Sequence, residues 1–140
     1  MLKIKLLTNK EFPNFEKIFS QYKEQKINYE DVIGHVFNQV YVAYHDEQLI
    51  GFIVFAIIYD RCELLDLYVD PDYRHQGIAE RLMQTMIEKV DSCSNISLEV
   101  CRDNNAAYHL YSKFGFKTVA VRERYYHGTD GYLMVKEVKK

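Results

Sequence analysis

The sequence has no tryptophan, only 2 prolines and 6 glycines in 140 residues, and a net charge of −2. Its three cysteines, Cys62, Cys93 and Cys101, are an odd number without a CxxC pair. This usage is typical of a reducing compartment and argues against a disulfide framework. The five histidines are scattered, with no HExxH motif and no Cys/His cluster. We therefore expect no metal.

The charge balance and the short apolar runs exclude further classes. A net charge of −2 provides no basic footprint for nucleic acid. The longest uncharged apolar run covers about residues 49–59, well short of the ~20 residues that a bilayer requires. No apolar stretch follows the first five residues as a secretory signal would require. We expect a cytoplasmic protein, a monomer or homodimer, with no nucleic-acid or membrane partner.

Apolar residues make up 48% of the chain, enough for one packed domain over residues 1–140. Hydrophobic periodicity predicts the following order. It gives strands at 4–7, 40–45, 49–59, 64–69, 96–101, 118–126 and 132–138, with helices at 12–22, within 23–39, at 77–90 and at 105–114. Asn105 is expected to cap the last helix, and Gly115 is expected to end it in the left-handed conformation. The strands at 64–69 and 96–101 flank a helix and should run parallel. This order predicts an α+β fold with a mixed sheet of about seven strands and about four helices.

The most informative segment joins the strand at 64–69 to the next helix. A polar loop follows Asp70-Pro71, and Gly77 then begins an amphipathic helix. Free amides at a helix start bind phosphate, and a glycine lets backbone approach it closely. The segment lacks the glycines of a dinucleotide fingerprint and the Gly-Lys-Ser/Thr of a Walker loop. It could equally be an ordinary strand-to-helix turn.

Several side chains could carry chemistry. Glu99 stands on the polar face of its strand, where it is either a proton acceptor or a solvated carboxylate. Tyr111 lies on the apolar stripe of the last helix, so on its own it fits a core position. Tyr125 and Tyr126 either wall a groove or pack the sheet. Cys101 has no evident histidine partner and is a poor candidate for a nucleophile.

Taken together, two motifs resemble the GNAT superfamily of acyl-CoA-dependent N-acetyltransferases. Arg74-x-x-Gly77-x-Ala79 is similar to its acyl-CoA signature. Asn104 to Tyr111, followed by Phe114-Gly115-Phe116, is similar to its second signature. Leu98-Glu99-Val100 and Arg124-Tyr125-Tyr126 are most like the branch of ribosomal-protein-alanine N-terminal acetyltransferases. The resemblance covers about residues 49–138.

The resemblance implies acetyl-CoA as co-substrate and assigns roles by position. It makes Glu99 the general base and Tyr111 the general acid, and it places Tyr125 and Tyr126 at the acceptor. Asn104 would touch the carrier's arm. The remaining acetyl-CoA contacts would come from the pantetheine-facing strand end, Leu67, Tyr68 and Val69, and from the pyrophosphate loop, Arg74, His75, Gln76, Gly77, Ile78, Ala79 and Glu80. Glu80 departs from the family pattern, because its charge would oppose bound phosphates unless it points away or Arg81 compensates.

The resemblance implies transfer of an acetyl group to a primary amine, with a protein or peptide N-terminal α-amine as the leading acceptor. The ribosomal-type enzymes carry a Pro-Trp-Ser stretch that this chain lacks, and proline where it has His127. Two alternatives therefore stay open. One is acetylation of a small amine, a polyamine or an aminoglycoside. The other is a non-catalytic acyl-CoA-binding sensor, against which the presence of both Glu99 and Tyr111 argues.

Overall fold

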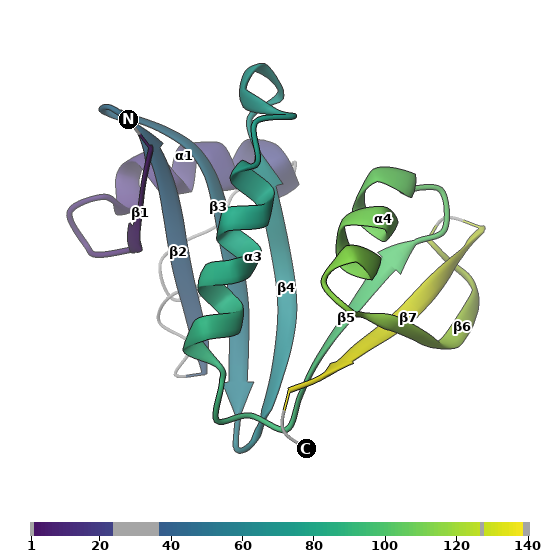
Figure 1. Ribbon diagram of the computed structural model, residues 1–140. Helices are drawn as coiled ribbons and strands as arrows, with labels where there is room; N and C mark the ends of the chain where they lie inside the picture. Colours follow the sequence, from purple (N-terminus) through teal and green to yellow (C-terminus); the bar gives the residue numbers. More distant parts are fainter. Residues whose placement is uncertain (1, 24–36, 127, 139–140) are drawn as a thin grey trace.

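The computed structural model describes residues 2–23, 37–126 and 128–138. Its elements follow the predicted order (Figure 1). They are β1 (Leu2–Leu6), α1 (Phe12–Lys23), β2 (Asn38–His45), β3 (Gln48–Ile58), β4 (Arg61–Val69), the 3-10 turn η1 (Pro71–Tyr73), α3 (Ile78–Lys89), β5 (Asn95–Cys101), α4 (Asn105–Lys113), β6 (Lys117–Tyr126) and β7 (Thr129–Glu137). The short helix predicted within 23–39 falls largely on residues 24–36, which lie outside the described part of the chain.

The seven strands form one mixed sheet in the order β1-β2-β3-β4-β5-β7-β6. β1 to β4 are antiparallel neighbours, as the predicted hairpin at 40–59 requires. β4 and β5 run parallel, which confirms the strand-helix-strand prediction. The last hairpin also forms, but β7 pairs with both β5 and β6 and so lies between them.

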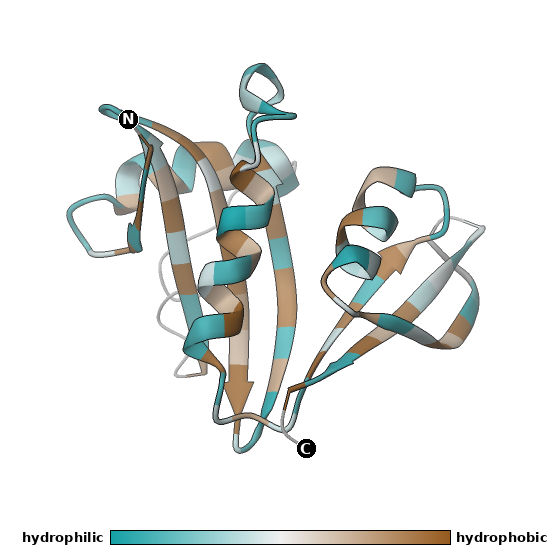
Figure 2. Ribbon diagram, in the orientation of Figure 1, coloured by the Kyte–Doolittle hydropathy of each residue, from teal (hydrophilic) through white to brown (hydrophobic). Residues whose placement is uncertain are grey.

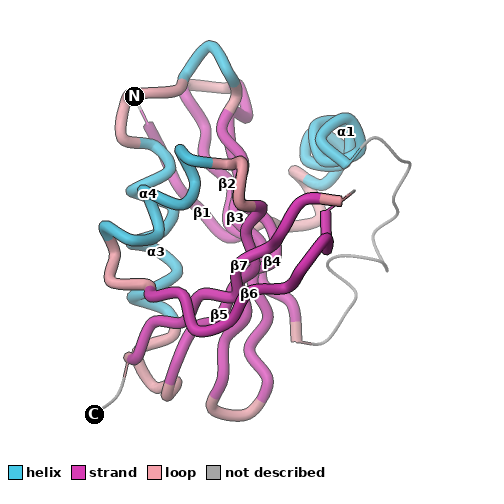
Figure 3. The backbone as a smooth tube through the Cα atoms, turned by 90° about the vertical axis from the view of Figure 1, so that its right-hand side faces the viewer, coloured by secondary structure: helices cyan, strands magenta, loops and turns pink. Residues whose placement is uncertain are grey.

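Helices cover both faces of the sheet. Seen edge-on, α1 lies on one side while α3 and α4 lie on the other (Figure 3). The side of α1 is packed with aromatic rings, and Phe15 stands 5.2 Å from Phe52 between ring centroids. The opposite core takes the apolar stripe of α3, including Leu82, Met83 and Met86, which are fully buried. Figure 2 shows hydrophobic and hydrophilic segments alternating along α3, as in an amphipathic helix. Burial of both sheet faces explains the continuously apolar β3.

The sheet opens between β4 and β5. These two strands pair only at Arg61–Asn95, Cys62–Ile96 and Glu63–Ser97. Beyond that point β4 has a bulge, because Val54 pairs with Asp66 while Phe55 pairs with Leu64. A bulge bends its strand and reverses the alternation of side chains beyond it. The two parallel strands therefore diverge toward their C-terminal ends, and most of the functional residues predicted from the sequence lie at that opening.

Candidate active site

A cleft of about 680 Å³ occupies the opening between β4 and β5. One wall, which we call the first wall, consists of β4, residues 71–77 and α3. The second wall consists of β5 and α4. The cleft brings together twelve of the residues predicted from the sequence: Leu67, Tyr68, Val69, Arg74, His75, Gly77, Ile78, Ala79, Glu80, Glu99, Asn104 and Tyr111.

Three other predicted residues are not among these twelve. Gln76 belongs to the loop but is not among the residues that line the cleft. Tyr125 and Tyr126 lie at the end of β6, and their side chains fall outside the described part of the structure. Their assignment to the acceptor stays a prediction.

The loop before α3 presents its backbone to the cleft. Both His75 and Gly77 have positive φ, at 65° and 79°. The first hydrogen bond of α3 runs from the Arg81 amide to the Gly77 carbonyl at 3.1 Å, so the amides of residues 78–80 precede the helical ladder. A Cβ added to Gly77 would meet no atom within 4 Å, so the space above the glycine is open. The loop thus offers free donors and room for an anion at a helix N-terminus.

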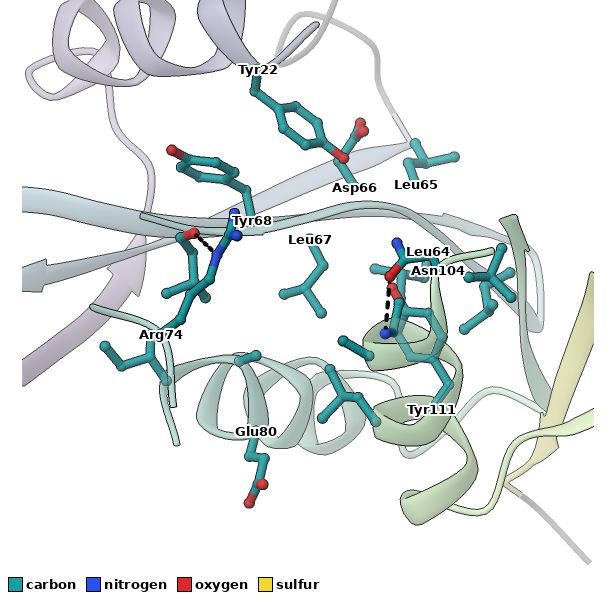
Figure 4. A pocket seen from close by; sticks show the side chains of 18 of the residues that line it. Tyr22, Leu64, Leu65, Asp66, Leu67, Tyr68, Arg74, Glu80, Asn104 and Tyr111 are labelled. Atoms are coloured by element: carbon teal, nitrogen blue, oxygen red, sulfur yellow. Dashed lines mark hydrogen bonds between the residues drawn. The ribbon is translucent and has the colours of Figure 1, made fainter. Parts of the chain in front are cut away.

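The edge of β4 supplies further backbone groups. The Asp70 amide donates to the Ile50 carbonyl of β3 at 2.7 Å. Because antiparallel bonding alternates, Tyr68 also turns its backbone toward β3, whereas Leu67 and Val69 turn theirs toward the opening. The Arg74 Nε donates to the Val69 carbonyl at 3.1 Å, which fixes the loop against the strand (Figure 4). The backbone role predicted for Leu67, Tyr68 and Val69 therefore fits Leu67 and Val69 better than Tyr68.

The second wall supplies side chains. Glu99 lies on the face of β5 opposite its buried Leu98 and Val100, with 23% of its side chain exposed. Its Oε1 forms an ion pair with Arg122 Nε of β6 at 2.9 Å. Tyr111 is 9% exposed, yet it also lines the cleft. The apolar stripe of α4 therefore places this tyrosine both against the core and at the site.

Asn104 corrects one expectation from the sequence. Asn105 was predicted as the N-cap of the last helix, but Asn104 is the N-cap, with Oδ1 accepting from the Ala107 amide at 3.2 Å. The cap occupies the side-chain oxygen of Asn104 and leaves its side-chain nitrogen, Nδ2, as a donor. Gly115 follows the helix with a φ of 93°, as predicted.

Glu80 does point away from the cleft interior, on the side of α3 away from Leu67 (Figure 4). Its carboxylate pairs with Lys113 of α4 at 2.9 Å. The cation that compensates the Glu80 charge is therefore Lys113. The sequence had suggested Arg81 for this role. This ion pair also links the two walls of the cleft.

A cluster on the α1 side of the cleft was not predicted from the sequence. Asp66 of β4 is 9% exposed, and its Oδ1 lies 2.8 Å from Lys23 Nζ. Burial raises the pKa of the Asp66 carboxyl, while hydrogen bonds from Lys23 and Tyr22 oppose that shift. The signal was present in the sequence, because Asp66 interrupts the apolar run Leu64-Leu65-Asp66-Leu67.

Two further observations concern metal binding and membrane crossing. Among the described residues, no three His, Cys, Asp or Glu side chains come together as a metal site would require. In the part of the chain with described structure, no helix has the length and apolar character needed to cross a bilayer.

Comparison with known proteins identifies a family and several relatives. Residues 4–116 match the model of the acetyltransferase (GNAT) family. The [ribosomal protein bS18]-alanine N-acetyltransferase of Escherichia coli K12 is 33% identical over 86 residues, which cover 60% of this chain and 58% of that protein. The chain thus matches less than two thirds of this curated relative's length. A second relative, from Bacillus subtilis, is 29% identical over 110 residues, covering 76% of this chain and 73% of that protein.

A solved structure agrees with the fold. The crystal structure of the Escherichia coli ribosomal-protein-S18-alanine N-acetyltransferase superposes with a TM-score of 0.87 at 23% identity, over 100% of this chain and 96% of that one. At this identity the likeness concerns the fold. With the family model matching most of the chain, including both motifs noted above, the chain belongs to the acetyltransferase (GNAT) family.

Proposed function

We propose that the protein transfers an acetyl group from acetyl-CoA to a primary amine, namely the α-amine of a protein or peptide N-terminus. The observation that carries this proposal is a single cleft with unlike walls. Free backbone amides lie on the first wall, and a carboxylate and a tyrosine lie on the second. A diphosphate-bearing thioester and an amine need these two kinds of group.

The first wall fits acetyl-CoA. The amides that begin α3 would bind the pyrophosphate, and the open space at Gly77 would admit it. The backbone of Leu67 and Val69 would bond the extended pantetheine arm, and the Asn104 amide nitrogen would contact it from the second wall. The chain's net charge of −2 attracts no anion, so these local donors must supply the affinity.

The second wall fits proton transfer. An α-ammonium group has a pKa of about 7.7–8.0, so little free energy is needed to release its proton at neutral pH. Glu99 takes this proton, directly or through water, while Arg122 holds the carboxylate by Oε1. The nitrogen then bonds to the acetyl carbon as the carbon–sulfur bond breaks. Tyr111 protonates the departing thiolate, and direct attack needs no covalent intermediate on Cys101.

The identity of the acceptor rests on the relatives. The Escherichia coli relative is named for acetylating the alanine of ribosomal protein bS18, and the Bacillus subtilis relative has the same name with the word "putative" before it. On the side of α1, the cleft is lined by Tyr22, Lys23 and Asp66. A peptide would approach Glu99 from this side. We therefore infer a peptide N-terminus in preference to a small amine.

A transfer assay tests the proposal. The purified chain is mixed with acetyl-CoA and a panel of N-terminal peptides and small amines. Release of CoA thiol is recorded, and each product is identified by mass. Acetylation of peptide α-amines is expected. Transfer to small amines alone would refute the acceptor, and acetyl-CoA binding without any transfer would favour the sensor.

A further inference from the structure

We propose that the site recognises a second positive charge on its acceptor, and that Asp66 binds it. The acceptor would be a peptide with lysine or arginine close behind its N-terminal residue. This inference rests on the proposed function, because it names the class of acceptor for the same cleft.

The structure contains a built site for an ammonium group. Lys23 Nζ lies 2.8 Å from Asp66 Oδ1, 5.6 Å from the ring centroid of Tyr22 and 5.9 Å from that of Phe19. Figure 4 shows Tyr22 extending toward Asp66 at the edge of the cleft. A carboxylate beside aromatic faces is the combination that proteins use to hold organic cations. Here the chain's own lysine occupies it.

Lys23 is suited to being displaced. It is the last residue of α1, and 38% of its side chain is exposed, whereas Asp66 is buried. A lysine on a flexible stem can move its ammonium group into water with little loss of packing. An unpaired buried carboxylate is unfavourable, so the ionised form of Asp66 favours a cation beside it. Exchange of one cation for another preserves that pairing, which removal of Lys23 alone would not.

The position of Asp66 relative to Glu99 explains why a cation of the acceptor would replace Lys23 at Asp66. The bulge in β4 turns Asp66 to the α1 side, and Glu99 projects to the same side of β5. Both carboxylates line the cleft on opposite sides of the opening. Each is already paired with a cation, Lys23 in one case and Arg122 in the other.

The two carboxylates must act on different nitrogens. A carboxylate that holds an ammonium group stabilises its protonated form, which cannot attack a thioester. The nitrogen bound by Asp66 is therefore not the one that reacts at Glu99. An acceptor that satisfies both carboxylates carries a reacting amine and a separate cation, as does a peptide with a basic residue after its first position.

The first test measures binding without turnover. Calorimetry compares 1,4-diaminobutane with butylamine on the wild type, on Asp66→Asn and on Lys23→Met. Losing a charged hydrogen bond should weaken diamine binding by about tenfold or more in Asp66→Asn. Lys23→Met keeps the stem of the lysine, removes the competing ammonium and should tighten binding. A purely structural Lys23–Asp66 pair predicts that both variants weaken binding, which would overturn the proposal.

The second test uses acetyl transfer and separates this inference from the proposed function. Peptides with the same N-terminal residue carry either lysine or glutamine at the second position. The wild type should favour the lysine peptide by about tenfold in kcat/KM, through KM, and Asp66→Asn should abolish the preference without changing KM for acetyl-CoA. Equal use of the two peptides by the wild type overturns the inference alone. Diamine binding without peptide preference would overturn the peptide assignment.

If no acceptor is acetylated, the proposed function fails while the calorimetric result still decides whether Asp66 binds cations. Thermal unfolding of all three proteins shows whether each variant remains folded. A diamine affinity that is equal in the wild type and in a folded Asp66→Asn variant would exclude a cation site.

Discussion

The two walls of the cleft differ in the groups that they present, because the first presents backbone groups and the second presents side chains. In the proposed function the first wall binds acetyl-CoA through its backbone, at the Gly77 loop and along the edge of β4, so binding depends on φ angles and hydrogen-bond direction. In the same proposal the second wall acts through the side chains of Glu99, Asn104 and Tyr111, all of which line the cleft. Substitutions on the first wall should therefore change acetyl-CoA affinity, and substitutions on the second should change the rate of transfer.

The largest expected effect is on the second wall. Glu99→Gln removes the proposed proton acceptor and should lower kcat by about 10²- to 10⁴-fold, the usual contribution of a general base. The affinity for acetyl-CoA, measured by calorimetry, should stay close to that of the wild type. Glu88→Gln removes a carboxylate from α3 outside the cleft and serves as control. Unchanged turnover at saturating acceptor would remove Glu99 from this role.

The matching change on the first wall is Gly77→Val. It places a branched Cβ in the open space where phosphate would approach the amides. Losing two charged hydrogen bonds predicts acetyl-CoA binding weaker by about 100-fold or more. Gly128→Val is the control, because Gly128 has a φ of 89°, has equally open space at its Cβ and lies outside the cleft. Native affinity in a folded Gly77→Val protein would contradict the anion site.

Tyr111→Phe should have a smaller effect than Glu99→Gln. A thiolate with a pKa near 8.5 leaves without full protonation, so we expect kcat to fall by about tenfold to 100-fold. Tyr108→Phe removes a hydroxyl from the same helix outside the cleft and should change kcat little. A fall in acetyl-CoA affinity with unchanged kcat would assign Tyr111 to binding instead.

The ion pair between Glu80 and Lys113 joins the two walls and offers a finer test. Lys113→Met leaves the Glu80 charge uncompensated near the presumed pyrophosphate. We expect acetyl-CoA affinity to fall about threefold to tenfold at low salt and to recover at high salt as the repulsion is screened. Stability should change by less than about 1 kcal/mol, because the pair is exposed. The double variant Glu80→Gln/Lys113→Met should regain the affinity.

The smallest effect concerns Asp66, the buried carboxylate on β4 of the first wall. Burial raises the pKa of Asp66, so the folded protein binds its proton more readily than the unfolded chain does. The contribution of Asp66 to stability therefore decreases as the pH rises from its unfolded value of about 3.9 through the raised folded value. Asp66→Asn should match or exceed the melting temperature of the wild type at pH 7, within about 4 °C, and lose that advantage in acid. A large loss at pH 7 would mean that Asp66 serves stability first.

Much of the site was predictable because its motifs are local. The spacing from Arg74 to Ala79, and from Asn104 to Gly115, lies within single strand-to-helix or helix-to-strand segments. The structure places the predicted site residues of both segments at one cleft, except that Gln76 does not line it. Asn104 replaced Asn105 as the helix cap because adjacent asparagines are equivalent in a sequence pattern, and only the geometry of the turn selects between them.

The sequence by itself determined the elements of this protein and their order, because periodicities of 2 and about 3.6 residues are properties of neighbouring side chains. Only the tertiary structure decided that β7 lies between β5 and β6, that a bulge turns Asp66 toward α1, and that Arg122 and Lys23 pair with Glu99 and Asp66. The physical reason is distance along the chain. Each of these pairings joins residues far apart in sequence, so it depends on which surfaces remain to be buried once the local elements have formed.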